Sequence, residues 1–132
     1  MAGETNLSKL LASMAPRMME DEFVFCTLKD AKYGDFTELS PIAAFCEAEG
    51  LTLVLPKYKA DKAGFRYESV FKGITLTVHS SLDAVGLTAV VSSRLAEQGI
   101  SANVMAAYYH DHIFVQSERA DDALAALREF GR

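Results

Sequence analysis

The chain has 132 residues, of which 50% are hydrophobic and 23% are charged, and its formal net charge is −5. This composition is typical of a folded globular protein, and the length suits one compact domain or two small ones that share a core. The acidic balance and the lack of any Lys/Arg cluster argue against a nucleic-acid partner, because binding to phosphates needs a basic face.

The N-terminal segment lacks the basic region and apolar run of a signal peptide, and the apolar stretches are far shorter than the roughly 20 residues that span a bilayer. Cys26 and Cys46 lie in apolar segments without CxxC spacing. We therefore expect buried, reduced thiols at both positions, in a soluble cytoplasmic protein with no membrane partner.

The sequence begins with a predicted helix and two predicted strands. Leucines share one face of a helix over 7–13, and Pro16 ends that stretch. A short strand at 17–19 is expected to turn through 20–21 into a second strand at 22–28. Apolar residues on both faces of this second strand indicate a central position in a sheet.

A polar connector over 29–39 follows these strands. Ser40 then has the character of an N-cap, with a proline in the first position of a predicted helix over 41–49 and a glycine behind it. Leucine and β-branched residues predict a strand at 51–55, and a single helical turn is expected at 59–63.

The clearest helix of the sequence lies in the second half. Before it, apolar and polar residues alternate over 73–79, which predicts a half-buried strand. Ser80, Ser81 or Asp83 can cap the helix, whose apolar residues recur at helical spacing, and Gly99 ends it.

The C-terminal part of the sequence predicts a hairpin and a helix. Strands at 100–108 and 113–116 flank a turn at 109–112, and Ser117 caps a last helix with an apolar stripe that ends at Phe130.

The two halves share an order of elements, which indicates two repeated units over 1–68 and 69–132. The helix after the first strand ends in Glu-Ala-Glu-Gly-Leu in one half and in Ala-Glu-Gln-Gly-Ile in the other. Each half also carries an Ala-Asp pair near the start of its second helix. The duplication rests on the order of elements more than on identical letters.

The run from Ile74 to Ala89, followed by the run from Leu95 to Val104, resembles an ACT domain. In that family a first strand leads through a glycine-containing turn into a helix, and Leu-Ala…Gly-Ile enters the second strand. Over roughly residues 7–130 the whole chain resembles an uncharacterised bacterial family of tandem ACT proteins.

The resemblance implies an α+β fold of two ferredoxin-like ACT units in tandem, each with helices on one face of an antiparallel sheet. A full ACT unit ends in a fourth strand, whereas here the last helix runs to the final residues. The N-terminal segment around Met18 or Phe25 is the candidate for that strand, exchanged between the halves.

The loop before the clearest helix is the candidate ligand site, because a helix N-terminus favours a carboxylate. Ser80 and Ser81 add hydroxyl donors, and Gly86, which has no Cβ, lets a ligand approach the backbone beside Val85. Asn103 offers a donor and an acceptor to the charged groups of an amino acid. The alternative is structural: the serines cap the helix, Gly86 relieves packing and Asn103 pairs locally.

Catalytic and metal-binding sites are not expected. His110 and His112 lie in a predicted turn without the Cys pair or HExxH motif of a zinc site. Neither serine lies in a Gly-x-Ser-x-Gly motif, the elbow that exposes a hydrolase nucleophile. We expect no catalytic residue, no metal and no cofactor.

The resemblance implies a non-enzymatic regulatory or sensor protein that binds a small-molecule effector, an amino acid, at an ACT–ACT interface. Such domains pair side by side, so a homo-oligomer, dimer or tetramer, is expected. The alternative is a ligand-free structural or oligomerisation adaptor for a protein partner. A polar pocket beside Gly86 favours the sensor, and a dry apolar seam favours the adaptor.

Overall fold

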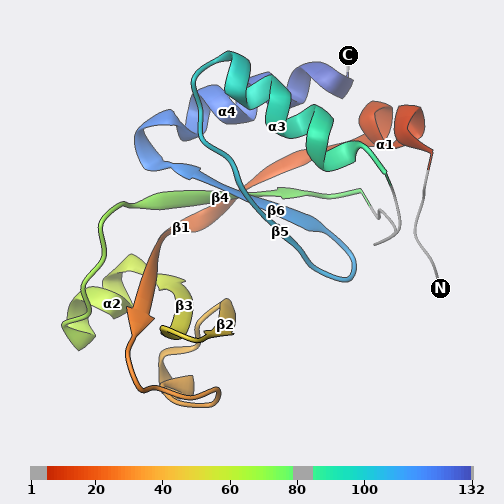
Figure 1. The fold of residues 1–132 in the computed structure, drawn as a ribbon. Coiled ribbons are helices and arrows are strands. Elements are labelled where there is room, and N and C mark those ends of the chain that lie inside the picture. Colours follow the sequence, from red (N-terminus) through yellow and green to blue (C-terminus); the bar gives the residue numbers. More distant parts are fainter. Residues whose placement is uncertain (1–5, 79–84, 132) are drawn as a thin grey trace. The chain divides into compact units, whose positions relative to one another are not determined.

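The computed structural model describes residues 6–78 and 85–131, which form an α+β fold (Figure 1). Its elements are α1 (Leu7–Ser13), β1 (Pro16–Leu28), β2 (Ala43–Glu47), β3 (Gly50–Pro56), α2 (Lys57–Ala63), β4 (Phe71–Leu76), α3 (Leu87–Glu97), β5 (Asn103–Ala106), β6 (Asp111–Gln116) and α4 (Ala120–Arg128). Short 3₁₀ helices lie at Thr37–Leu39, Ser117–Arg119 and Glu129–Gly131. Within the described ranges, no helix is both long enough and apolar enough to cross a membrane.

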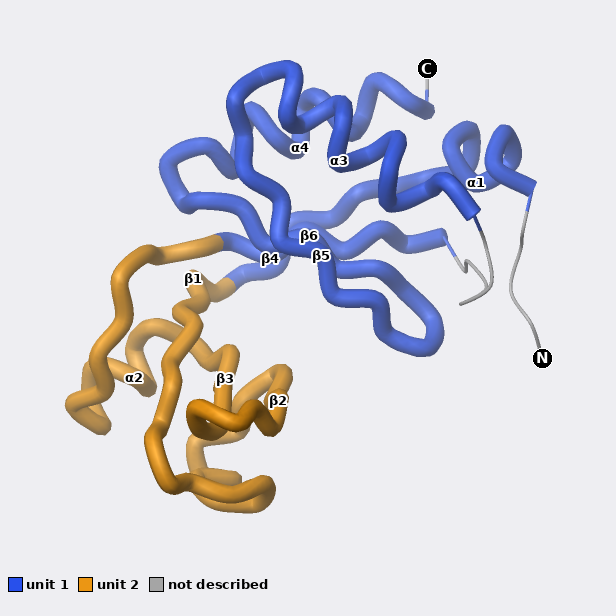
Figure 2. Tube along the Cα trace, in the orientation of Figure 1, with its two compact units in different colours: residues 1–20, 72–132 blue, residues 21–71 orange. Residues whose placement is uncertain are grey.

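The chain forms two compact units, which Figure 2 shows in different colours. Unit 1 combines residues 1–20 with residues 72–132, and unit 2 consists of residues 21–71. The division at 68/69 concerns the repeats of the sequence and stays a prediction.

The strands follow the order β2-β3-β1-β4-β6-β5 in a six-stranded sheet. Residues 16–20 of β1 belong to unit 1, and residues 21–28 belong to unit 2. Within unit 1 the N-terminal segment therefore lies beside β4, in the place of the fourth strand that the C-terminal half lacks. The expectation that residues near Met18 supply this strand is confirmed.

Unit 1 has its own hydrophobic core beneath its helices. The alternation of β4 turns Ile74 and Leu76 inward, and helical spacing brings Leu87, Val91 and Leu95 of α3 onto them. In Figure 1, α1, α3 and α4 lie over one face of the strands of unit 1. The buried members of this core are Leu10, Met14, Ile74, Leu76, Leu87, Val91, Leu95, Ile100, Ile113, Val115, Ala120, Ala123, Ala126 and Leu127.

Unit 2 has a smaller core on the antiparallel strands β1, β3 and β2. Cys26 of β1 lies opposite Leu53 of β3, and both are buried. Cys46, on the edge strand β2, lies opposite Leu51 of β3 and is exposed. The expectation of a buried thiol is therefore confirmed for Cys26 and wrong for Cys46. Burial raises the pKa of the Cys26 thiol, which disfavours its reactive thiolate form.

The predicted break at 20–21 is wrong, because β1 runs without interruption from Pro16 to Leu28. The charged residues that suggested a turn, Glu20 to Glu22, are exposed residues in the middle of a strand. This segment contains no Gly, Pro or Asn, the residues that set a turn conformation.

The helix predicted over 41–49 is also wrong, because β2 pairs with β3 there as a hairpin. Ser40 has a left-handed backbone (φ 49°), whereas an N-cap is extended. Gly50 pairs with Glu47 at the turn of the hairpin and does not end a helix. The Glu-Ala-Glu-Gly letters therefore form a hairpin turn, unlike their counterpart near Gly99.

The last helix begins differently from the prediction. The carbonyl of Ser117 accepts a hydrogen bond from the backbone N–H of Ala120, within a 3₁₀ turn. The Ser117 hydroxyl is buried and has no hydrogen-bond partner among the residues that the structure describes. Ser117 therefore starts the turn through its backbone, and its predicted side-chain cap is wrong.

Candidate functional site

The N-terminus of α3 is formed by Gly86, which is its N-cap. Gly86 has a left-handed backbone (φ 98°, ψ −19°), and its carbonyl accepts the first helical hydrogen bond, from Val90 at 3.0 Å. A Cβ at Gly86 would lie 3.2 Å from Leu7 Cδ2, so α1 packs closely against this point. The positive φ favours glycine, and a Cβ would press on the end of the Leu7 side chain, which gives Gly86 a structural role whether or not a ligand binds.

The surroundings of this helix N-terminus suit an anion. Val85 is 84% exposed, and the first turn of α3 contains no acidic side chain. The first N–H groups of a helix have no partner within the helix, and the helix dipole is positive at this end. A carboxylate at Val85–Gly86 would therefore meet hydrogen-bond donors and a favourable field.

The structure accounts differently for the other predicted site residues. Asn103 pairs with Phe114 in the β5–β6 hairpin, and its side-chain Nδ2 donates to the Phe114 carbonyl at 3.2 Å. This contact is the local pairing of the structural alternative, although the side-chain oxygen of Asn103 remains an available acceptor. Ser80 and Ser81 lie outside the described residues.

A buried polar cluster that the sequence did not indicate lies at the start of β6. Asp111 is the buried charged residue of the described chain, and desolvation raises its pKa, while the charge of His112 lowers it. His112 Nδ1 lies 3.0 Å from the Thr75 hydroxyl on β4. Desolvation, followed by the charge of His110, lowers the pKa of His112, while the charge of Asp111 raises it.

This cluster does not resemble a metal centre in the described part of the chain. The rings of His110 and His112 are 6.4 Å apart, and no three His, Cys, Asp or Glu side chains converge among the described residues. His79, the third histidine of the sequence, lies outside the described residues. The expectation of no metal stays a prediction.

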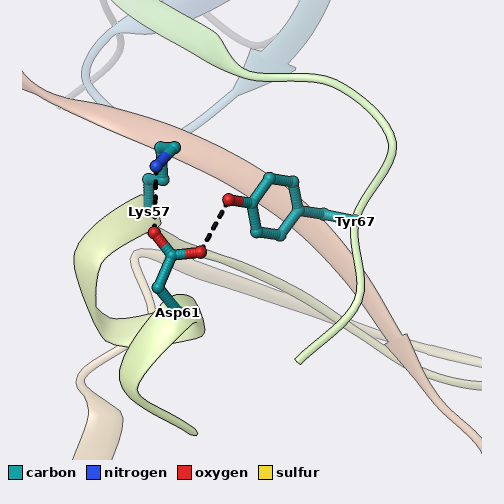
Figure 3. Close-up of polar contacts among 3 residues, drawn as sticks. All are labelled: Lys57, Asp61 and Tyr67. Atoms are coloured by element: carbon teal, nitrogen blue, oxygen red, sulfur yellow. Dashed lines mark hydrogen bonds and ion pairs between the residues drawn. The ribbon is translucent and has the colours of Figure 1, made fainter. Parts of the chain in front are cut away.

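A second polar network, in unit 2, ties the segment after α2 to that helix (Figure 3). Asp61 accepts hydrogen bonds from the Tyr67 hydroxyl at 2.6 Å and from Lys57 Nζ at 2.9 Å. The bond from Tyr67, followed by the bond from Lys57, lowers the pKa of Asp61. The same contacts raise the pKa values of Lys57 and Tyr67. Neither is therefore activated as a nucleophile or base, and the network is structural.

Comparison with known structures relates the chain to a protein from Vibrio cholerae. The two are 56% identical with a TM-score of 0.88, and the match covers 96% of each chain. That protein is described as one of unknown function and a possible transport protein. A search of curated proteins found no match.

More distant structures share the fold. A protein from Agrobacterium tumefaciens is 15% identical, with a TM-score of 0.73 and 89% of each chain covered. The regulatory subunit of aspartate kinase from Thermus thermophilus, in a ligand-free form, is 10% identical with a TM-score of 0.65. That match covers 90% of this chain and 97% of the subunit.

Family models match the sequence in both halves. One model described as ACT domain matches residues 2–72, more than half of the chain, and a second model with the same description matches residues 68–129. The chain therefore belongs to the ACT domain family.

Proposed function

We propose that this protein is a non-enzymatic regulatory sensor that binds an amino acid at the N-terminus of α3. Membership of the ACT family supports a regulatory role, as does the shared fold with a regulatory subunit. The observation that carries the proposal is the N-terminus of α3, where exposed Val85 and Gly86 precede a first turn without acidic residues.

In this proposal the amino acid's carboxylate binds the free N–H groups of the first turn of α3. Ser80 and Ser81 contribute hydroxyl donors, and Asn103 contacts the ligand from β5. The close contact between Leu7 and Gly86 limits what a substitution at Gly86 can test, because any side chain there is strained. Val85 is the better position, because its side chain is exposed and a change there leaves the packing intact.

The test is a thermal-shift screen over amino acids, with Val85→Glu and Val85→Thr as a matched pair. At a hundredfold excess over the dissociation constant, a ligand adds about 2.7 kcal/mol of stability, which is a shift of several degrees. Glutamate at this position favours the helix, but it repels a carboxylate and should weaken binding about tenfold. Val85→Thr should keep the shift. Equal shifts in both variants would place the site elsewhere.

The alternative function is a ligand-free adaptor, and one observation favours it. The left-handed backbone of Gly86 and its close contact with Leu7 explain why glycine is present there without any ligand. If no amino acid or nucleotide shifts the melting temperature of the unmodified protein, the adaptor is correct.

We also propose that the protein forms a homo-oligomer, a dimer or tetramer, in the cytoplasm. β2 is an edge strand of the sheet, and its Phe45 is 70% exposed. Pairing with a second copy would cover such an edge. Light scattering at micromolar concentration should show an oligomer, and a monomer would contradict this proposal.

A further inference from the structure

Unit 2 contains an open pocket of about 480 Å³, a size typical of small-molecule sites. Its apolar floor includes Leu51 and Leu53 of β3, both buried. Its walls come from the connector that precedes β2 and from the first residues of β2. The irregular connector, which ends where the sequence wrongly predicted a helix over 41–49, leaves space over the sheet.

The connector that forms the wall is held in a costly conformation. Asp30, Phe36 and Ser40 have left-handed backbones with φ of 66°, 65° and 49°. For residues other than glycine this costs about 1–2 kcal/mol each, so the surrounding structure must enforce it. The Phe36 ring packs edge-to-face on Phe65 at 5.2 Å, and the N–H of Ser40 donates to the Thr37 carbonyl at 3.0 Å. The wall is therefore formed before any ligand arrives.

The charge of the lining selects the ligand. Asp35 is the ionised side chain of the lining, which contains no Lys, Arg or His. Its Oδ2 accepts a hydrogen bond from the Lys32 N–H at 2.8 Å, which fixes the carboxylate. Its Oδ1 has no hydrogen-bond partner in the part of the chain that the structure describes. The hydroxyls of Thr37 and Ser40 add neutral polar groups. An anion would find no cation here, whereas an ammonium group would find a fixed carboxylate.

We propose that this pocket is a second ligand site, which binds a small amine with its ammonium group against Asp35. The aliphatic or aromatic body of the amine covers Leu51 and Leu53. The site is independent of the N-terminus of α3, because each unit provides one of them.

The experiment is an NMR titration of the ¹⁵N-labelled full chain with three probes of one shape: benzylammonium, benzyl alcohol and benzoate. Benzylammonium should shift backbone amides within residues 32–44 and 51–53, benzyl alcohol should bind more weakly, and benzoate weakest. Equal affinity for the three probes, or amide shifts confined to other residues, would overturn the proposal.

Matched variants test the role of the carboxylate. Asp35→Asn preserves the acceptor for the Lys32 N–H but removes the charge, and should weaken benzylammonium about three- to fivefold because the pair is exposed. Glu38→Gln is the control, since Glu38 is exposed on the same connector but does not line the pocket. If both variants weaken binding equally, the attraction is only the net charge of the protein, and the site is rejected.

A third variant tests the cavity itself. Ala44 is an exposed residue of β2 that lines the pocket, so Ala44→Leu fills the space without disturbing the core. It should abolish the shifts from both benzylammonium and benzyl alcohol, and unchanged binding would exclude this pocket. Val85→Glu should leave benzylammonium binding intact, which separates this result from the test of the α3 site.

Discussion

Removal of residues 6–20 should unfold the C-terminal half of the protein. A fragment of residues 69–132 keeps β4, α3, β5, β6 and α4, but it lacks α1 and the first part of β1. The structure predicts that this fragment is unfolded. A permuted chain, in which residues 72–131 are joined through a flexible linker to residues 6–20, should fold.

The size of the effect follows from what the N-terminal segment buries in unit 1. Leu10 is 0% exposed and Met14 is 4% exposed, and burial of each such side chain contributes about 1.5–3 kcal/mol. Their loss therefore removes about 3–6 kcal/mol. The fragment also loses the bond from the Thr77 hydroxyl to the Ala15 carbonyl, at 2.7 Å, and the strand beside β4. Complete domains have only about 5–15 kcal/mol of stability, so a small unit cannot tolerate this loss.

The geometry of the permuted chain is favourable. A Cβ at Gly131 would lie 3.5 Å from the Met14 carbonyl, so the end of the chain lies beside the C-terminus of α1. The linker must reach the other end of this helix, about 10 Å away, and eight Gly/Ser residues span about 15 Å.

Circular dichroism melting and the dispersion of amide signals in NMR spectra distinguish the outcomes. The permuted chain should melt cooperatively, and Leu10→Ala in it should cost about 2–5 kcal/mol. The fragment of residues 69–132 should give no cooperative transition. A cooperative melt of that fragment at the temperature of the permuted chain would refute the assignment of residues 6–20 to unit 1.

Three further predictions concern single residues. Asp111→Asn should raise the melting temperature at pH 7, because the raised pKa of Asp111 means that its ionised form opposes folding. This gain should disappear below the pKa of the unfolded state, near 3.8, and a gain that does not depend on pH would contradict the prediction. Gly50→Ala should cost clearly more stability in denaturant titrations than Gly64→Ala. Both glycines have a positive φ, but of the two only Gly50 would bring a Cβ against a backbone atom, the Leu28 oxygen at 2.7 Å. Equal losses of stability would contradict this clash. Tyr67→Phe should raise the pKa of Asp61 in an NMR titration, since the tyrosine bond is the largest single cause of the lowered pKa, and an unchanged pKa would contradict it.

The parts of the fold that were predictable are those with strong local patterns. The apolar residues of β4 alternate with the period of a strand, those of α3 recur with the period of a helix, and a glycine follows the end of α3. The predicted helix over 41–49 failed because Ser-Pro and the alanines favour a helix locally, while the pairing of β2 with β3 is decided by residues elsewhere in the chain. The helix and strand propensities of residues 41–49 therefore cannot predict that pairing.

The candidate site was predictable only in part. The position of Gly86 at a helix N-terminus follows from the turn and the apolar stripe behind it. The contact with Leu7, which gives Gly86 a structural role, depends on where α1 packs and leaves no mark in the local sequence. The burial of Asp111 is equally a tertiary effect, because a polar residue near a turn is normally exposed. The pocket in unit 2 could not be predicted either, because it depends on how the connector and the start of β2 lie over β3.

The course of β1 also affects how the chain folds during its synthesis. Ala15 and Thr77, which are hydrogen-bonded, are 62 residues apart in sequence, so the start of β1 is made long before the strand that will cover it. Unit 2 can close its hairpins in the meantime, but such distant pairing is slow, and an uncovered strand is prone to aggregate. Glu20, Asp21 and Glu22 lie exposed in the middle of this strand. Three consecutive negative charges at this place would repel a second nascent chain, which is the effect expected of charged gatekeeper residues on an uncovered strand.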